Sequence, residues 1–219
     1  MAVPPYKAGY RRFKWRDSVR NRPVWGDVWF PSNDVSKEIA IFWALGEGKI
    51  VRDATLASVG TPFPLVVMSP GASGSAPSYS WLAEYLARHG VIVLGVSHYG
   101  ESWLYGADTV EPGAVMRLWV GSADCSVALT QLLTCDEFRA CLDPRSNQDR
   151  CVGSLFWGCH RPGARWRDAR LHCALGILPV GRLRVCSSVA WVMISWTGTL
   201  EQGLDSLRDW VTAIVRANG

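Results

Sequence analysis

The pattern of apolar and polar positions is clearest between Pro64 and Gly100. Residues 65–68 form a short apolar run, LVVM, which is typical of a strand buried on both faces of a sheet. A turn rich in glycine, proline and serine follows, and apolar residues then recur at helical spacing as far as Gly90. Residues 91–96 form a second apolar run. The pattern predicts a strand–helix–strand unit whose parallel strands belong to a sheet covered on both faces.

The segments before this unit predict further strands of the same sheet. Val24 and residues 27–30 indicate a strand that Pro31 closes, one of an antiparallel pair at the sheet edge. Residues 33–48 combine polar positions with the run IAIFWAL and predict a short helix or an insertion. Residues 49–57 predict another edge strand.

The segments after the unit predict a loop and a long helix. Residues 99–113 are rich in glycine and polar side chains and follow a strand, at the sheet edge where open α/β folds bind ligands. Residues 114–138 have apolar positions at helical spacing, and Leu142-Asp143-Pro144 closes that helix before another buried strand. We expect one domain over residues 1–219.

The composition is typical of a globular protein and argues against nucleic acid and membranes as partners. The chain is 48% hydrophobic and 19% charged, as globular proteins are, and its net charge is +4. Its arginines are scattered and form no basic stripe among aromatic residues, which argues against nucleic acid as a partner. The N-terminus lacks the apolar core of a signal peptide, and the apolar run 185–196 is too short to span a membrane. We therefore expect a cytoplasmic protein without a membrane partner.

The cysteines and histidines of the last third allow two interpretations. All seven cysteines follow residue 120, and an odd, uneven set is a poor disulfide framework. Metal ligands are one interpretation, but the spacing lacks the paired C-x-x-C pattern of zinc sites. Free thiols in a reducing compartment are the other, and we expect no metal. The residues concerned are Cys151, Cys159, His160, His172 and Cys173.

Several segments in order resemble the α/β-hydrolase fold. They are RPVWGDVWFP near the N-terminus, PLVVMSPGASGS, YSWLAEYLARHGVIVLGVSHYG, and a helix that ends in LDP. More narrowly, residues 10–144 resemble the bacterial esterases that are similar to dienelactone hydrolase and platelet-activating-factor acetylhydrolase. The resemblance implies a mostly parallel central sheet with flanking helices, and a serine nucleophile that hydrolyses a small carboxylic ester or lactone without a cofactor.

The resemblance also implies an oxyanion hole in the turn after residue 68. The family pattern S-H-G-x-G reads Ser69-Pro70-Gly71-Ala72-Ser73-Gly74 in this chain. Backbone N–H groups of Gly71, Ala72 and Ser73 match the position that stabilises the tetrahedral intermediate of acyl transfer. Pro70 departs from the pattern. The alternative is a plain glycine turn between a strand and a helix.

The nucleophile elbow of the family is missing from this sequence. Family members follow LDP with a strand and then G-H-S-x-G-G, a sharp turn that holds the serine above the sheet. No G-x-S-x-G occurs anywhere in this chain, so the catalytic residues are unknown. The first serines to examine would be Ser73, Ser97 and Ser154.

The genetic code suggests why the elbow is missing. If the codons for residues 148–166 are read one base later, they permit RIGVLGHSFGGATALALAG, the strand, elbow and helix of the family pattern. In that frame Ser154 can become histidine, Leu155 can become serine and Trp157 must become glycine. The sequence therefore predicts a frameshift near residue 145, with residues 145–219 an aberrant, irregular tail shorter than the family's own. A divergent but genuine tail is the alternative.

Three functions stay open on the sequence. The first is an esterase of this family that is inactive as written, because it lacks the elbow. The second is a non-catalytic domain that keeps the hydrolase sheet and binds a ligand or partner. The third is a metal-binding module built on the tail.

Overall fold

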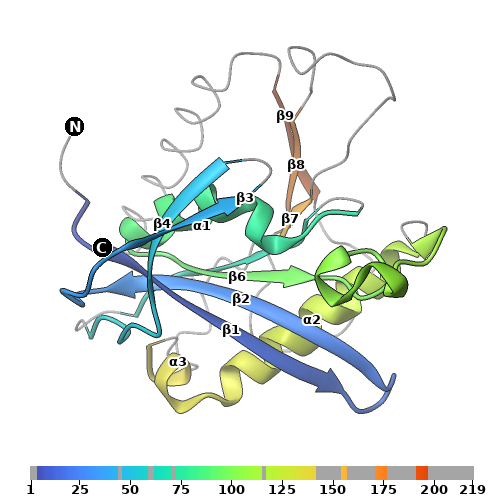
Figure 1. The fold of residues 1–219 in the computed structure, drawn as a ribbon, viewed down its shortest axis with the longest axis horizontal. Coiled ribbons are helices and arrows are strands. Elements are labelled where there is room, and N and C mark those ends of the chain that lie inside the picture. The colour runs from blue at the N-terminus through green and yellow to red at the C-terminus, as the bar shows by residue number, and fades with distance from the viewer. Residues whose placement is uncertain are drawn as a thin grey trace.

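The sheet of this protein carries helices on both of its faces (Figure 1). The computed structural model describes residues 4–43, 46–58, 62–70, 73–114, 117–141, 154–156, 171–176 and 191–196. Within them the sheet has nine strands in the order β3-β4-β1-β2-β6-β5-β7-β8-β9. The strands are β1 Lys7–Asp17, β2 Arg22–Ser32, β3 Ile39–Trp43, β4 Gly46–Arg52, β5 Leu65–Met68, β6 Ile92–Ser97, β7 Ser154–Phe156, β8 Leu171–Gly176 and β9 Trp191–Trp196.

The predicted strand–helix–strand unit is confirmed. Strands β5 and β6 are parallel neighbours, with Leu65 opposite Ile92 and Met68 opposite Gly95. A 3-10 turn, η1 (Ala76–Tyr79), leads into the connecting helix α1 (Ser80–Arg88). Gly90 follows the helix with a φ of 86°, a left-handed conformation that favours glycine and turns the chain into β6.

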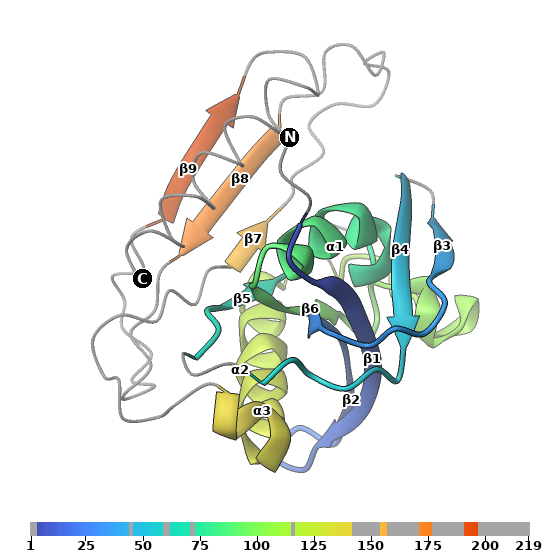
Figure 2. The same ribbon diagram turned by 90° about the vertical axis from the view of Figure 1, so that its left-hand side faces the viewer.

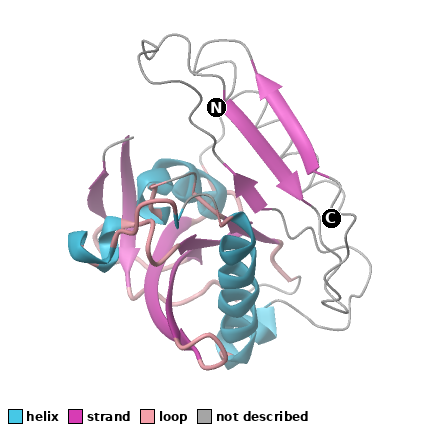
Figure 3. Cartoon of the chain, turned by 90° about the vertical axis from the view of Figure 1, so that its right-hand side faces the viewer, coloured by secondary structure: helices cyan, strands magenta, loops and turns pink. Residues whose placement is uncertain are grey.

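Helices lie on the two faces of the sheet in the views of Figures 2 and 3, and each face carries a core of its own. Because side chains alternate along a strand, Val66 and Val93 face α1, whereas Val67 and Leu94 face the helices of the opposite side. Those helices are α2 (Leu118–Thr134) and α3 (Asp136–Cys141). Burial on both faces explains the continuous apolar runs in the sequence of β5 and β6.

The N-terminal strands extend the sheet further than the sequence indicated. β1 and β2 form the expected antiparallel pair, but β2 also pairs with β6, so this pair is not at the edge. The short helix considered for residues 33–48 is wrong, because β3 and the start of β4 occupy that segment as an antiparallel hairpin. β4 also pairs with β1 and is not an edge strand. Local apolar residues predicted an element here, and the pairing of β3 with β4 decided that it is a strand.

The sheet is mixed, which corrects the expectation of a mostly parallel one. Parallel pairing occurs between β5 and β6, between β5 and β7, and between β1 and β4. The other neighbouring pairs are antiparallel. The helix predicted over residues 114–138 begins at Leu118 and continues, after a break at Cys135, as α3.

Three short strands are described in the C-terminal third. Strand β7 pairs in parallel with β5, and β8 and β9 follow it in antiparallel order. These segments differ from the irregular tail that we expected there, and the remainder of residues 145–219 lies outside the described part of the chain. No helix in the described residues is long and apolar enough to cross a membrane.

Candidate functional site

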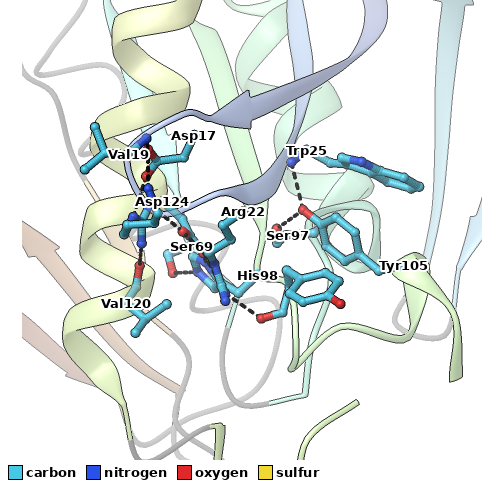
Figure 4. A network of polar contacts seen from close by, with 12 residues as sticks. Asp17, Val19, Arg22, Trp25, Ser69, Ser97, His98, Tyr105, Val120 and Asp124 are labelled. Atoms are coloured by element: carbon cyan, nitrogen blue, oxygen red, sulfur yellow. Dashed lines mark hydrogen bonds and ion pairs between the residues drawn. The ribbon is translucent and has the colours of Figure 1, made fainter. Parts of the chain in front are cut away.

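A buried polar network lies where β5 and β6 end (Figure 4). Ser69 directly follows β5 and His98 directly follows β6, and because the strands are parallel both residues reach the same sheet edge. The antiparallel strand β2 begins at this edge with Arg22, and α2 brings Asp124 over it. Three separate strands and one helix therefore meet at the network.

The centre of the network is a hydrogen-bonded chain of hydroxyl, imidazole and carboxylate. Ser69 Oγ lies 2.8 Å from His98 Nε2, and His98 Nδ1 lies 3.2 Å from Asp124 Oδ2. An ionised carboxylate can only accept, so Nδ1 carries the hydrogen and donates it to Asp124. In the neutral imidazole Nε2 is then an acceptor, and the Ser69 hydroxyl donates to it. This is the order of groups in a serine hydrolase triad.

Two arginines compensate the charge of Asp124. Arg22 Nε lies 3.0 Å from Asp124 Oδ1, and Arg20 Nη2 lies 2.8 Å from the same oxygen. Burial alone would raise the pKa of Asp124, but hydrogen bonds from His98 and Arg22 outweigh it and the pKa is lowered. Arg20 also pairs with Asp17. The cluster thus holds two carboxylates and two guanidinium groups, and its formal charges balance without a charged imidazole.

Close packing holds the imidazole in place. His98 has only 4% of its surface exposed, Ser69 has 7% and Asp124 has 1%. Gly121 of α2 lies against the ring, and a Cβ there would be 3.3 Å from His98 Nε2. Cys125 lies beside Ser69, and its burial raises the pKa of the thiol to about 12, so it stays protonated at neutral pH. Gly121, Asp124 and Cys125 share one helix face, as their spacing requires.

A second set of hydrogen bonds supports the end of β6. The Tyr105 hydroxyl donates to the carbonyl of Ser97 over 2.8 Å and accepts from the backbone N–H of Trp25 over 2.8 Å. Burial raises the pKa of Tyr105, so the hydroxyl keeps the proton that it donates. On the other side, the Ser97 hydroxyl accepts from the N–H of Ala76 at 3.0 Å. The strand end that carries His98 is therefore fixed from both sides.

Among the described residues, the serines that the sequence singled out are not part of this chain of groups. Of the oxyanion candidates, Gly71 and Ala72 lie outside the described residues, and Ser73 is exposed with a φ of 60°. The other serines marked for examination also lie elsewhere. Ser97 is fully buried, and its hydroxyl accepts a hydrogen bond from the N–H of Ala76. Ser154 lies in β7, where its backbone pairs with Val67 of β5.

No metal site can be built from the part of the chain that the structure describes. No three His, Cys, Asp or Glu side chains among these residues are grouped so that they could hold an ion together. His172 and Cys173 lie in β8, and the other tail candidates, Cys151, Cys159 and His160, fall outside the described residues.

Sequence reasoning missed Ser69, His98 and Asp124 as a set. Ser69 and His98 could have been found, because each comes immediately after a predicted parallel strand. Asp124 carried no such signal, since it is one polar residue within a predicted helix. Only the placement of α2 across the strand ends brings it to the imidazole.

Comparisons with known proteins support the fold. No family model matches the sequence, and no curated protein matches it. Among solved structures, a ferulic acid esterase from Streptomyces cinnamoneus is similar, with a TM-score of 0.50 and 23% sequence identity. The match covers 72% of this chain and 53% of the esterase, so the chain spans about half the length of that protein. The chain therefore shares an α/β fold with that structure.

Proposed function

We propose that this protein derives from α/β-hydrolase esterases that use a serine nucleophile on small carboxylic esters or lactones, and that the chain as written is inactive. The observation that carries the lineage is the parallel pairing of β5 with β6 through the connecting helix α1, together with the likeness to an esterase structure. The narrower tie to the dienelactone-hydrolase-like and platelet-activating-factor-acetylhydrolase-like branch rests on the sequence segments alone.

The proposed loss of activity rests on the missing elbow. Acyl transfer in this family needs a serine held on a sharp turn beside a histidine and the oxyanion donors. No G-x-S-x-G occurs in the chain, and removing the nucleophile of a serine protease costs on the order of a million-fold in rate. We propose that the elbow was lost through a frameshift near residue 145. Sequencing codons 143–170 tests this, because a shifted frame without a serine elbow would contradict it.

The site proposed for the ester is the sheet edge after β5 and β6. It would take a small neutral molecule and needs no cofactor, since hydroxyl, imidazole and backbone N–H groups supply the chemistry of the lineage. A cytoplasmic location is also a proposal, and the free thiols of Cys125, Cys135 and Cys141 support it.

Hydrolysis of short p-nitrophenyl esters tests the proposed function. The purified chain is compared with a version re-encoded in the shifted frame from residue 148 onward and extended to family length. We expect turnover only by the re-encoded protein, and its loss after treatment with a serine-directed phosphonate. Turnover by the chain as written, abolished by the same phosphonate, would contradict the proposed inactivity.

A further inference from the structure

We propose that Ser69 is a latent nucleophile that small activated acyl or phosphoryl donors modify once, with His98 as its base. The first observation behind this is the geometry of the three groups. The hydroxyl, imidazole and carboxylate stand in sequence at 2.8 Å and 3.2 Å, and the tautomer that Asp124 imposes leaves Nε2 free to take the Ser69 proton. The proposal goes beyond the proposed function, which assigns no nucleophile.

The second observation is that the base cannot turn away from the hydroxyl. Gly121 lies under the ring, and the imidazole is held at both nitrogens in a site with 4% exposure. Asp124 acts as a positioning residue, because it fixes the ring without touching the nucleophile. Its own position is set by Arg22 and Arg20. A preorganised base of this kind needs no rearrangement before proton transfer.

The same surroundings restrict the reaction to small, reactive donors. Ser69 has 7% of its surface exposed, so a bulky acyl group does not fit without rearrangement. Asp124 already pairs with two guanidinium groups, so it stabilises a developing imidazolium less than an unpaired carboxylate would. A good leaving group therefore has to supply more of the driving force for the transfer.

The proposed step is a simple acyl transfer with p-nitrophenyl acetate as the donor. The Ser69 proton moves to His98 Nε2 while Oγ bonds to the carbonyl carbon. The bond between that carbon and the aryl oxygen breaks, and the aryl oxide takes the proton from Nε2. The products are acetyl-Ser69 and p-nitrophenol, with no oxidation or reduction. With diisopropyl fluorophosphate, Oγ bonds to phosphorus and fluoride leaves with the proton.

Intact-mass measurement and peptide mapping test the proposal on the full chain. With either probe we expect one adduct, located on Ser69, in the wild type and in the matched control Ser122→Ala, which changes an exposed serine of α2. Ser69→Ala should lose the adduct. His98→Asn should form it at least about 10²-fold more slowly, because a general base contributes about 10²–10⁴-fold.

The roles of Ser69 and His98 can be tested even if Ser69→Ala folds poorly. The comparison of the wild type with His98→Asn then carries the test, because that variant keeps the Ser69 hydroxyl and removes only the base. An adduct on another residue, no adduct, or equal rates in the wild type and His98→Asn would overturn the proposal and leave the proposed inactivity intact. Continuous ester turnover that depends on Ser69 would support the nucleophile and contradict the inactivity.

Discussion

The imidazole of His98 rests on Gly121, so closely that a Cβ at the glycine would lie 3.3 Å from Nε2 and 3.4 Å from Cε1. The helix α2 can approach the end of β6 because this position carries no side chain. The ring has little room to yield, since Ser69 and Asp124 bind its two nitrogens.

Gly121→Ala should therefore destabilise the protein despite the better helix propensity of alanine. Alanine gains about 1 kcal/mol in a helix interior, whereas overpacking costs about 1–3 kcal/mol, so we expect a net loss of up to about 2 kcal/mol. Urea unfolding measures it, with Ser122→Ala as the control on the same helix. In a His98→Ala background Gly121→Ala should become stabilising, and an unchanged loss there would exclude the imidazole as the cause.

Asp124 should make the protein sensitive to acid. Its folded pKa lies below the unfolded value of about 3.9, so its stabilisation is complete above that value and is lost as pH falls below it toward the lower folded pKa. The free energy of unfolding of the wild type should drop in this window, and the drop should be smaller in Asp124→Asn. Asp108→Asn, at an exposed carboxylate, is the control. Parallel pH profiles for the wild type and Asp124→Asn would refute this assignment.

Asp124→Asn should also lower stability at neutral pH. The substitution leaves the guanidinium group of Arg22 without a carboxylate and leaves Arg20 with Asp17 alone. Breaking a buried pair in this way costs about 3–5 kcal/mol. Because Arg20 and Arg22 are partly exposed, with 28% and 15% of their side chains accessible, we expect the lower end of that range. Denaturant titration at pH 7 measures the loss. A change within about 0.5 kcal/mol would mean that water or Asp17 replaces the lost contacts.

Gly95 in β6 should not tolerate a side chain. A Cβ there would lie 2.7 Å from the Cβ of Ala76 and 3.0 Å from the Trp29 ring. Gly95→Ala should cost about 1–3 kcal/mol by overpacking, because Ala76 cannot rotate out of the way. Thermal and urea unfolding measure the change. Adding Ala76→Gly should recover part of it, and strictly additive losses would show that the two positions do not compete for the same space.

Tyr10→Phe should lower the free energy of unfolding, because it removes a hydrogen-bond donor from the buried carboxylate of Asp27. The Tyr10 hydroxyl donates to Asp27 Oδ1, and Asp27 is fully buried with Oδ2 lacking a hydrogen-bond partner in the described part of the chain. Removing one more donor should cost about 1–3 kcal/mol. Tyr6→Phe, which keeps the ring contact with Phe63, is the control. Equal stability of the two variants would indicate that Arg12, 2.6 Å from Oδ1, satisfies the carboxylate by itself.

The sequence by itself determined the central unit of this protein. The apolar runs of β5 and β6, the helical spacing of α1 and the glycine stop at Gly90 are local signals, and the structure has all of them where expected. They suffice because a strand buried on both faces leaves a run of apolar residues that few other elements share. The missing elbow is likewise a property of the sequence alone.

Only the tertiary structure decided the neighbours of β1 and the content of the polar network. Whether residues 33–48 form a helix or strands depends on the backbone pairing of β3 with β4, which the apolar pattern of this segment did not indicate. Ser69 and His98 are 29 residues apart, and His98 and Asp124 are 26 apart. Their contact depends on the register of β5 against β6 and on the crossing of α2 over the strand ends, and both are set by packing across the whole sheet.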